Sequence, residues 1–328
     1  MEKEKIIIDC FGCDNPESVI KGVAKTIRNL PEIKLIAAGN RKTIEEILKD
    51  EEFDKSRLEI LDAEEIITND DSPVDAIMHK KNSSLVKSFL RLKNDGEVAA
   101  MVSAGSTGAV LAGSSVILGR CEGVDRPALS AFLPTDDGKE VCLVDCGANV
   151  DCRPEQLLQF SKYGADYMRC VHGIAAPRIG LLSVGAEDKK GNALGKATFK
   201  LLKDSDLNFK GNIEARTVLC GDVDVVVTDG FAGNVLLKTI EGTANSMIKK
   251  TLYLLKKHLP KEYDGSFIKS AFAELMQQVD FNSLGGGVIL GVKKVIVKCH
   301  GSSNSDTIFN SVRQAVKMLE GGFNKTLK

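Results

Sequence analysis

The stretch that most constrains the fold spans residues 223–242 and reads VDVVVTDGFAGNVLLKTIEG. Its three consecutive valines are typical of a short strand buried on both faces of a parallel sheet. Asp229 then opens a turn that leads into a helix. Gly230 and Gly233 permit close backbone approach, so the first amides of that helix are expected to face a ligand. An anion would suit such a position.

Two polar residues of the helix that follows are candidates for the same site. Asn234 stands where a helix cap or a ligand-facing amide is expected, and Lys238 lies one turn further along the same face. A well-capped turn without any ligand would carry the same residues, because lone Gly-x-x-Gly turns are common in α/β proteins. Further turns of this kind would strengthen the prediction of a site.

Two other strand-to-helix turns have the same composition. They read AMVSAGSTGAVLAG at residues 100–113 and VIVKCHGSSNS at residues 295–305. Such turns gather at the carboxyl ends of strands, where ligands of open α/β sheets bind, so three of them predict one pocket. The candidate substrate-binding residues lie in these turns, at the exit of the first strand and in one polar loop: Asp9, Asn15, Ser103, Gly105, Ser106, Thr107, Asn149, Asp151, Asp229, Gly233, His300, Gly301, Ser302 and Ser303.

Two loops supply the remaining candidates. The polar loop at residues 145–154, DCGANVDCRP, contains side chains that could bind a ligand or could only form Asx turns. The loop at residues 184–196, VGAEDKKGNALGK, carries Lys190 in a glycine-bounded segment. A cation on a mobile loop can close over an anionic ligand, although a solvated pair with Lys189 is the commoner case.

Composition excludes several classes of protein. The 328 residues include 44 Lys and Arg against 45 Asp and Glu, which gives no global attraction to nucleic acid. No apolar stretch approaches the ~20 residues of a spanning helix, and the N-terminus lacks the apolar core of a signal peptide, so a cytoplasmic protein is expected. The nine cysteines and four histidines have no supported metal-binding spacing, so we expect no metal and no cofactor.

Apolar strands and amphipathic helices alternate, which predicts one continuous α/β domain over residues 1–328. Asn15 before Pro16 is typical of a helix start. The strands at residues 128–133 and 141–145 are joined by PTDDGKE, whose Asp-Gly indicates a hairpin, so the sheet should contain an antiparallel pair. The predicted fold class is therefore α/β, a three-layer α/β/α arrangement with a mostly parallel mixed sheet.

Eight segments, spread from residue 9 to residue 305, read DCFGCDNPES, VSAGSTGAVLAG, GRCEGVDRPAL, LVDCGANVDCRPEQL, GLLSVGAEDKKGN, GNIEAR, VVVTDGFAGNVLLKTIEG and VKCHGSSNS. In this order they resemble the bacterial phosphate acyltransferases of phospholipid synthesis, the PlsX family. The resemblance implies an acyl carrier protein thioester and inorganic phosphate as substrates, and acyl phosphate and free carrier protein as products. It also implies a fold related to phosphotransacetylases and isopropylmalate dehydrogenases.

The resemblance further implies a homodimer, peripheral association with the membrane, and a glycerol-3-phosphate acyltransferase acting downstream. Three positions depart from the family pattern. Cys13 replaces a glycine, Ser106 replaces an asparagine, and Ala193 replaces a glutamate. Ser106 still offers a hydrogen bond, but the change at Ala193 removes a carboxylate that could have served as a general base.

Acyl transfer of this kind needs no catalytic triad, because phosphate can attack a thioester without a protein base and a thiolate leaves readily. Backbone amides, Lys190 and Lys238 would hold the phosphate, and Asn234 would face the oxygen that becomes negative. Cys299 beside His300 is the one arrangement that could suggest a thiol nucleophile. Neighbours on a strand point to opposite faces, so we do not expect this pair to act together.

Three alternatives stay open. A phosphotransacetylase acting on acyl-CoA would share the chemistry and differ only in the thiol carrier. A catalytically silent, membrane-bound scaffold for the carrier protein would explain the departures at Cys13, Ser106 and Ala193. An NAD-dependent dehydrogenase would share the fold class, but no strand is followed by GxGxxG with an acidic residue ~20 positions on.

A helical hairpin is expected to project over residues 240–280, because apolar residues recur there at three- and four-residue spacing on both sides of Pro260. Its lysines could contact an anionic membrane or the acidic carrier protein, while its apolar stripe, which continues to Leu259, could form a dimer interface. On the residues alone the dimer is favoured. The residues assigned to membrane or carrier contact are Lys249, Lys250, Leu252, Leu255, Lys256 and Lys257.

Overall fold

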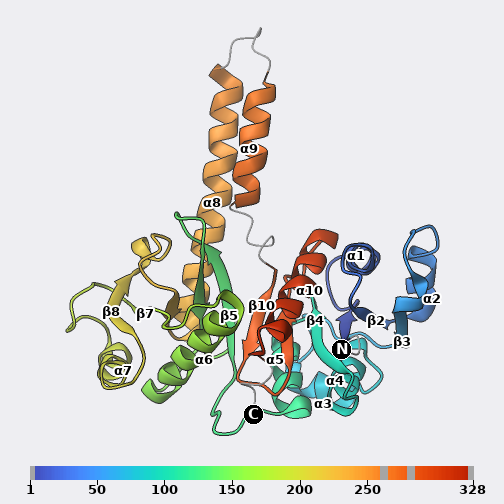
Figure 1. The fold of residues 1–328 in the computed structure, drawn as a ribbon, viewed down its shortest axis with the longest axis horizontal. Coiled ribbons are helices and arrows are strands. Elements are labelled where there is room, and N and C mark those ends of the chain that lie inside the picture. Colours follow the sequence, from blue (N-terminus) through green and yellow to red (C-terminus); the bar gives the residue numbers. More distant parts are fainter. Residues whose placement is uncertain (1–3, 259–264, 279–284, 324–328) are drawn as a thin grey trace.

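A computed structural model describes residues 4–258, 265–278 and 285–323. Within these ranges, one sheet of 11 strands runs through the molecule, with helices on both faces and a helical hairpin standing out from the body (Figure 1). The strands are β1 (Lys5–Asp9), β2 (Lys34–Gly39), β3 (Leu58–Asp62), β4 (Val98–Ser103), β5 (Ala128–Pro134), β6 (Glu140–Val144), β7 (Ile179–Ser183), β8 (Phe209–Glu214), β9 (Val225–Val227), β10 (Gly287–Leu290) and β11 (Val295–Lys298). The helices are α1 (Pro16–Asn29), α2 (Arg41–Ile47), α3 (Pro73–His79), α4 (Ser84–Asn94), α5 (Thr107–Gly113), α6 (Pro154–His172), α7 (Ala193–Lys203), α8 (Gly230–His258), α9 (Ser266–Gln278) and α10 (Ser305–Glu320).

The sheet consists of two parallel groups that run in opposite directions. Its strand order is β3-β2-β1-β4-β11-β10-β5-β6-β9-β7-β8. The first group is β3, β2, β1, β4 and β11, and the second is β6, β9, β7 and β8. Between them, β10 and β5 pair antiparallel with each neighbour. The three antiparallel pairs, β11 with β10, β10 with β5 and β5 with β6, reverse the direction of one group relative to the other.

The register then brings the carboxyl ends of the two groups together. Val297 of β11 pairs with Val288 of β10, and Val288 pairs with Ser130 of β5. Ser130 in turn pairs with Val144, the last residue of β6. The strands of the two groups therefore end at the same level, in the middle of the molecule, and the turns that follow them approach from opposite directions.

Alternating side chains of the strands enter two different cores, as a strand covered on both faces requires. In β1, Ile6 and Ile8 belong to a cluster shared with α1, α6 and α10. Ile7 belongs to a second cluster on the other face, with α3, α4 and α5. Leu236 of α8 joins a third cluster with Val226 of β9. The three-layer α/β/α fold predicted from the sequence is confirmed.

Local signals in the sequence were reliable where a single residue type determines the geometry. Asn15 caps α1, with its side chain accepting a hydrogen bond from the Ser18 amide at 3.1 Å. The Asp-Gly hairpin joins β5 and β6 antiparallel, and Gly138 adopts a φ of 76°. Strands β8 and β10 were not predicted from the sequence. β10 has only four residues, and the six residues of β8, FKGNIE, alternate poorly between apolar and polar side chains.

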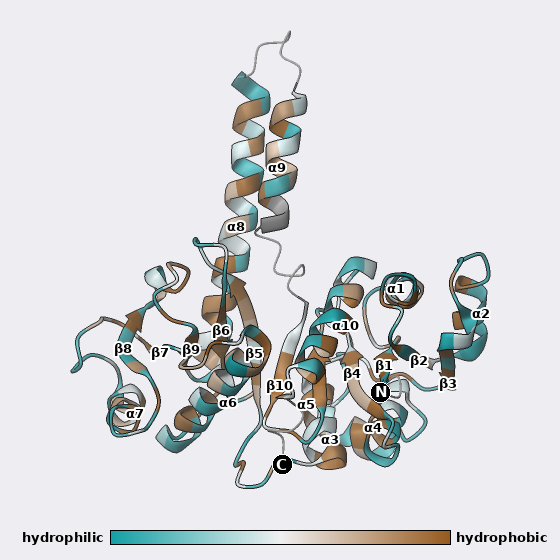
Figure 2. Cartoon of the chain, in the orientation of Figure 1, coloured by the Kyte–Doolittle hydropathy of each residue, from teal (hydrophilic) through white to brown (hydrophobic). Residues whose placement is uncertain are grey.

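The hairpin consists of the 29-residue helix α8 and the antiparallel helix α9, side by side in Figure 1. Leu252 and Leu255 are half-buried, whereas other apolar side chains of α8 and α9 are exposed. These exposed residues are Met247, Tyr253, Leu254, Phe267 and Leu275. Figure 2 shows hydrophobic and hydrophilic residues mixed along both helices. Leu259, which was assigned to the apolar stripe, lies outside the described residues.

Within the described ranges, none of the helices is both long enough and apolar enough to cross a bilayer.

Candidate active site

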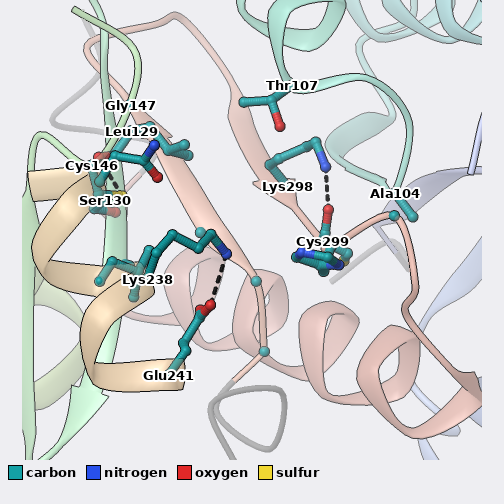
Figure 3. A pocket seen from close by; sticks show the side chains of 18 of the residues that line it. Ala104, Thr107, Leu129, Ser130, Cys146, Gly147, Lys238, Glu241, Lys298 and Cys299 are labelled. Atoms are coloured by element: carbon teal, nitrogen blue, oxygen red, sulfur yellow. Dashed lines mark hydrogen bonds and ion pairs between the residues drawn. The ribbon is translucent and has the colours of Figure 1, made fainter. Parts of the chain in front are cut away.

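A cleft of about 480 Å³ lies where the two groups of strands end (Figure 3). It is lined from one side by the turns after β4 and β11 and from the other by α8. Its polar lining includes Asp14, Gly105, Thr107, Asn234, Lys238, Glu241, Lys298, His300 and Gly301. Its apolar lining includes Leu129, Ala131 and Phe132 of β5 and Leu237 of α8. The cleft therefore combines charged groups from both strand groups with one apolar wall.

The loop after β6 is held in shape by a buried carboxylate. Asp145 accepts hydrogen bonds from the backbone amides of Leu129, Gly147, Ala148 and Asn149, at 2.7 to 3.2 Å. The Asn149 side-chain amide donates to it as well, at 2.8 Å. Burial raises the pKa of Asp145, and these hydrogen bonds act in the opposite direction because they favour its charged form. These hydrogen bonds hold the loop in one shape, and the start of α8 packs against it.

The start of α8 packs directly on this loop. The Gly230 amide donates to the Asn149 carbonyl at 2.7 Å, and the Ala232 amide donates to Asp229 Oδ1 at 2.8 Å. A Cβ atom on Gly233 would lie 1.9 Å from the Asp145 carbonyl oxygen. The two glycines thus permit close packing between helix and loop. The expectation that these first amides face an anion is wrong, because protein groups already accept hydrogen bonds from them.

Because α8 begins at Gly230, Asn234 lies inside the helix and is not its cap. Asn234 is exposed and lines the cleft, next to Gly147. A Cβ atom on Gly147 would lie 3.9 Å from Asn234 Cγ. Lys238, one turn further along, also lines the cleft, and its ammonium lies 2.7 Å from Glu241 Oε2. Of the two roles that the sequence left open for Asn234, only the ligand-facing one agrees with this position.

The turn after β4 is anchored by Asp9, which is fully buried. Its carboxylate accepts hydrogen bonds from Ser84 Oγ at 2.6 Å and from Ser103 Oγ at 2.8 Å. Ser103 Oγ in turn accepts a hydrogen bond from the Gly105 amide at 3.1 Å. Burial raises the pKa of Asp9 to about 6. Asp9 and Ser103 therefore position the turn, whereas Gly105 and Thr107 line the cleft itself.

The turn after β11 does not form a thiol–imidazole pair. Cys299 Sγ is buried and donates to Ser311 Oγ of α10 at 3.0 Å, and burial raises the pKa of this thiol. Instead, Nδ1 of the His300 ring lies 2.8 Å from Ser302 Oγ. Elsewhere in the described part of the chain, no three His, Cys, Asp or Glu side chains come together in a metal-binding arrangement.

Six of the residues predicted from the sequence come together in the cleft: Gly105, Thr107, Asn234, Lys238, His300 and Gly301. The other candidates lie outside its lining. Some of them make the internal contacts of the fold, as Asp9, Asn15, Ser103, Asn149, Asp229 and Gly233 do. Ser106 and Ser303 are buried, and Asp151 and Ser302 are exposed but do not line the cleft. A polar loop that binds its own backbone has the same composition as one that binds a ligand.

Lys190 is also outside the lining of the cleft. It is exposed on the loop that follows β7, where its amide donates to the Glu187 carbonyl at 3.0 Å. Conversely, Lys298 and Asp14 do line the cleft but were not predicted from the sequence as site residues. Lys298 is the last residue of the otherwise apolar strand VIVK, and a charge ending a buried strand was the signal available for it.

Comparison with known proteins places the chain in a family. A profile described as fatty acid synthesis protein matches residues 4–326. A phosphate acyltransferase of Anoxybacillus flavithermus is 43% identical over 325 residues, covering 99% of this chain and 97% of that protein. A phosphate acyltransferase of Bacillus pumilus is 43% identical over 317 residues, covering 96% and 94%.

A solved phosphotransacetylase from Streptococcus pyogenes superposes with a TM-score of 0.62 at 15% identity, covering 96% of this chain and 94% of that one. At that identity the likeness concerns the fold, and it agrees with the three-layer architecture. The sequence similarity extends over nearly the whole chain and includes every turn that surrounds the cleft. The chain belongs to the fatty acid synthesis protein family.

Proposed function

We propose that this protein is an acyltransferase that moves a fatty acyl group from an acyl carrier protein thioester to inorganic phosphate. The products are acyl phosphate, for use in phospholipid synthesis, and the free carrier thiol. The observation that carries the proposal is a cleft with lysines on both sides and an apolar wall, in a chain similar over its full length to phosphate acyltransferases. We treat residues 1–328 as one continuous catalytic unit.

The reaction needs no nucleophile from the protein, because phosphate itself attacks the thioester. A phosphate oxygen attacks the thioester carbonyl carbon, forming a C–O bond and a tetrahedral intermediate. Collapse of the intermediate breaks the C–S bond, and the thiolate takes the proton that the phosphate brought. Because phosphate is largely deprotonated near neutral pH, the main tasks left to the protein are to position the reactants and to stabilise negative charge.

Asn234 is proposed to donate a hydrogen bond to the carbonyl oxygen as it becomes negative. Its place in the cleft, on a helix start fixed by Gly230 and Gly233, gives the rigidity that such a donor needs. Lys238 is proposed to attract the phosphate, with Glu241 restraining its ammonium. Lys190 is proposed to join them when the loop after β7 closes over bound substrate.

The apolar wall of the cleft suits the acyl part of the substrate. Leu129 and Ala131 project from β5 to the same apolar cluster as Leu237 of α8, and all three line the cleft. Burial of methylene groups against such side chains is favourable by ~0.8 kcal/mol each. The thioester carbon would then lie between this wall and the polar turns, within reach of Asn234.

The hairpin is proposed to carry the contacts with other molecules. Its exposed apolar residues would pair with a second copy of the chain, and its lysines would give reversible contact with anionic lipid or with the carrier protein. Residues 249, 250, 256 and 257, all lysines, are exposed on α8. Peripheral contact with the membrane would place the acyl phosphate near a glycerol-3-phosphate acyltransferase, which we propose as the enzyme that consumes it.

The test is to incubate the purified protein with an acyl carrier protein thioester or with acyl-CoA, each with and without phosphate, and to measure acyl phosphate. The proposal predicts a phosphate-dependent product from the carrier thioester. Product from acyl-CoA alone would instead assign a phosphotransacetylase. No product from either thioester would favour a silent scaffold.

A further inference from the structure

Lys298 is a buried cation that has no acidic partner in the part of the chain that the structure describes. Its side chain is 8% exposed, and its ammonium donates to the backbone carbonyl of the neighbouring Cys299. Across the described residues, no carboxylate oxygen lies within 4.0 Å of this ammonium. Burial lowers the pKa of Lys298, against a weaker opposite influence from Asp9 and Asp14. A buried charge is costly unless a counter-charge is provided.

The position of Lys298 suggests where that counter-charge comes from. Lys298 is the last residue of β11, and it pairs with Ser103, the last residue of β4. The turn after β4, which contains Gly105 and leads to Thr107 at the start of α5, therefore begins beside Lys298. Lys298, Gly105 and Thr107 all line the cleft. Figure 3 shows Lys298 and Thr107 on one side of the cleft and Lys238 on the other. An anion in the cleft would have a cation on each side.

The two lysines differ in how free they are to bind an anion. Lys238 is already paired with Glu241 at 2.7 Å and sits on an exposed helix face. Lys298 is buried and forms no ion pair with any described residue. Binding of an anion would therefore offset the cost of burying its charge and add an attraction in a medium of low dielectric constant. Burial already restricts the Lys298 side chain, so little further side-chain entropy is lost on binding.

We infer that Lys298 holds the phosphate in the cleft as its principal cationic contact, with Thr107 beside it. This inference rests on the proposed function and assigns one substrate-binding residue to it. Phosphate held there lies at the meeting point of the two strand groups, from which it can attack a thioester carbon placed between Asn234 and the apolar wall.

The test compares Lys298→Met with Lys294→Met. Methionine keeps the length of the side chain and removes the charge. Lys294 is a suitable control, because it lies near the opposite end of β11, also donates to a backbone carbonyl, that of Val98, at 2.9 Å, and does not line the cleft. In acyl phosphate formation at saturating carrier thioester, Lys298→Met should raise the KM for phosphate by ~10- to 100-fold, the usual effect of losing a hydrogen bond to a charged group. The KM for the thioester, and both constants in Lys294→Met, should stay near the wild-type values.

A second measurement does not depend on turnover. Added phosphate should raise the unfolding temperature of the wild-type protein and of Lys294→Met in a saturable manner, and Lys298→Met should need ~10- to 100-fold more phosphate for the same rise. If Lys298→Met does not fold, the inference can be tested on the wild-type protein by acetylation with acetic anhydride. Phosphate should slow the acetylation of Lys298 and leave that of Lys294 unchanged. An unchanged phosphate KM in a folded Lys298→Met, or no protection of Lys298, would overturn the inference. If phosphate binds at Lys298 but no acyl phosphate forms, the proposed function fails and the anion site stands.

Discussion

The packing of α8 on the loop after β6 predicts a large effect from one methyl group. A Cβ atom on Gly233 would lie 1.9 Å from the Asp145 carbonyl oxygen, which is far inside van der Waals contact. In Gly233→Ala the start of α8 must therefore move away by roughly 1 Å. Overpacking of a tight contact costs ~1–3 kcal/mol, and a backbone oxygen cannot rotate aside, so we expect a loss near ~3 kcal/mol. Displacing Asn234 by that distance should also lower turnover by ~100-fold.

Gly242→Ala is the matched control, because Gly242 lies in the same helix and a Cβ atom there would meet no atom within 4 Å. It should be stabilised by ~0.5–1 kcal/mol through the better helix propensity of alanine and keep wild-type turnover. Urea unfolding would give the two stabilities, and acyl phosphate formation would give the two rates. Equal stability and equal turnover in the two variants would refute the close contact and the positioning role that we derive from it.

Three further predictions concern other parts of the chain. Replacing Cys10, Cys13 and Cys299 by Ala or Ser should leave activity within about tenfold, since only packing is affected, and trapping an acyl group on Cys299 would contradict this. Changing Lys249, Lys250, Lys256 and Lys257 to Glu should abolish binding to anionic vesicles, at ~1 kcal/mol per lysine, while dimerisation and some turnover with a soluble carrier are retained. Loss of dimerisation would place these lysines in the subunit interface, and unchanged vesicle binding would show that they do not contact the membrane. Burial raises the pKa of Asp9 from 3.8 to about 6, so the folded protein binds more protons than the unfolded chain between those values and the free energy of unfolding should fall as pH rises through that window. Asp9→Asn should remove this dependence in urea unfolding measured across the same range, and an unchanged slope would show that Asp9 is not its source.

Much of the fold could be predicted because it depends on local signals. Asn15 before Pro16 marks a helix start, and Asp137-Gly138 marks a hairpin, for reasons that involve only a few neighbouring residues. The opposition of the two strand groups could not be predicted in this way. It depends on the pairing of β10 with both β11 and β5, and the residues of β10 are only GVIL, preceded by two glycines.

The site was predicted in outline for a related reason. Gly105 and His300 lie in turns, and Asn234 lies just after a turn, whose composition indicates a ligand, and the register of the sheet brings these segments together. Asp9 and Asn149 have the same kind of sequence context but bind the protein's own groups. Long-range hydrogen bonds decide which polar residue has which task, and they are formed only by the folded chain. Lys298 was missed because one charge after an apolar run is also typical of a strand that ends in solvent.

The most direct test of the central claim is the rate of acyl phosphate formation from an acyl carrier protein thioester by Asn234→Ala. Asn245→Ala is the matched control, since Asn245 is exposed on the same helix and does not line the cleft. Loss of a transition-state hydrogen bond should lower turnover by ~100-fold or more in Asn234→Ala, and Lys190→Ala should behave similarly if its loop closes over the substrate. Both should keep the fold, and Asn245→Ala should match the wild type. Near-normal turnover in Asn234→Ala would contradict the account, because the reaction would then proceed without the hydrogen bond that we propose Asn234 donates to the carbonyl oxygen.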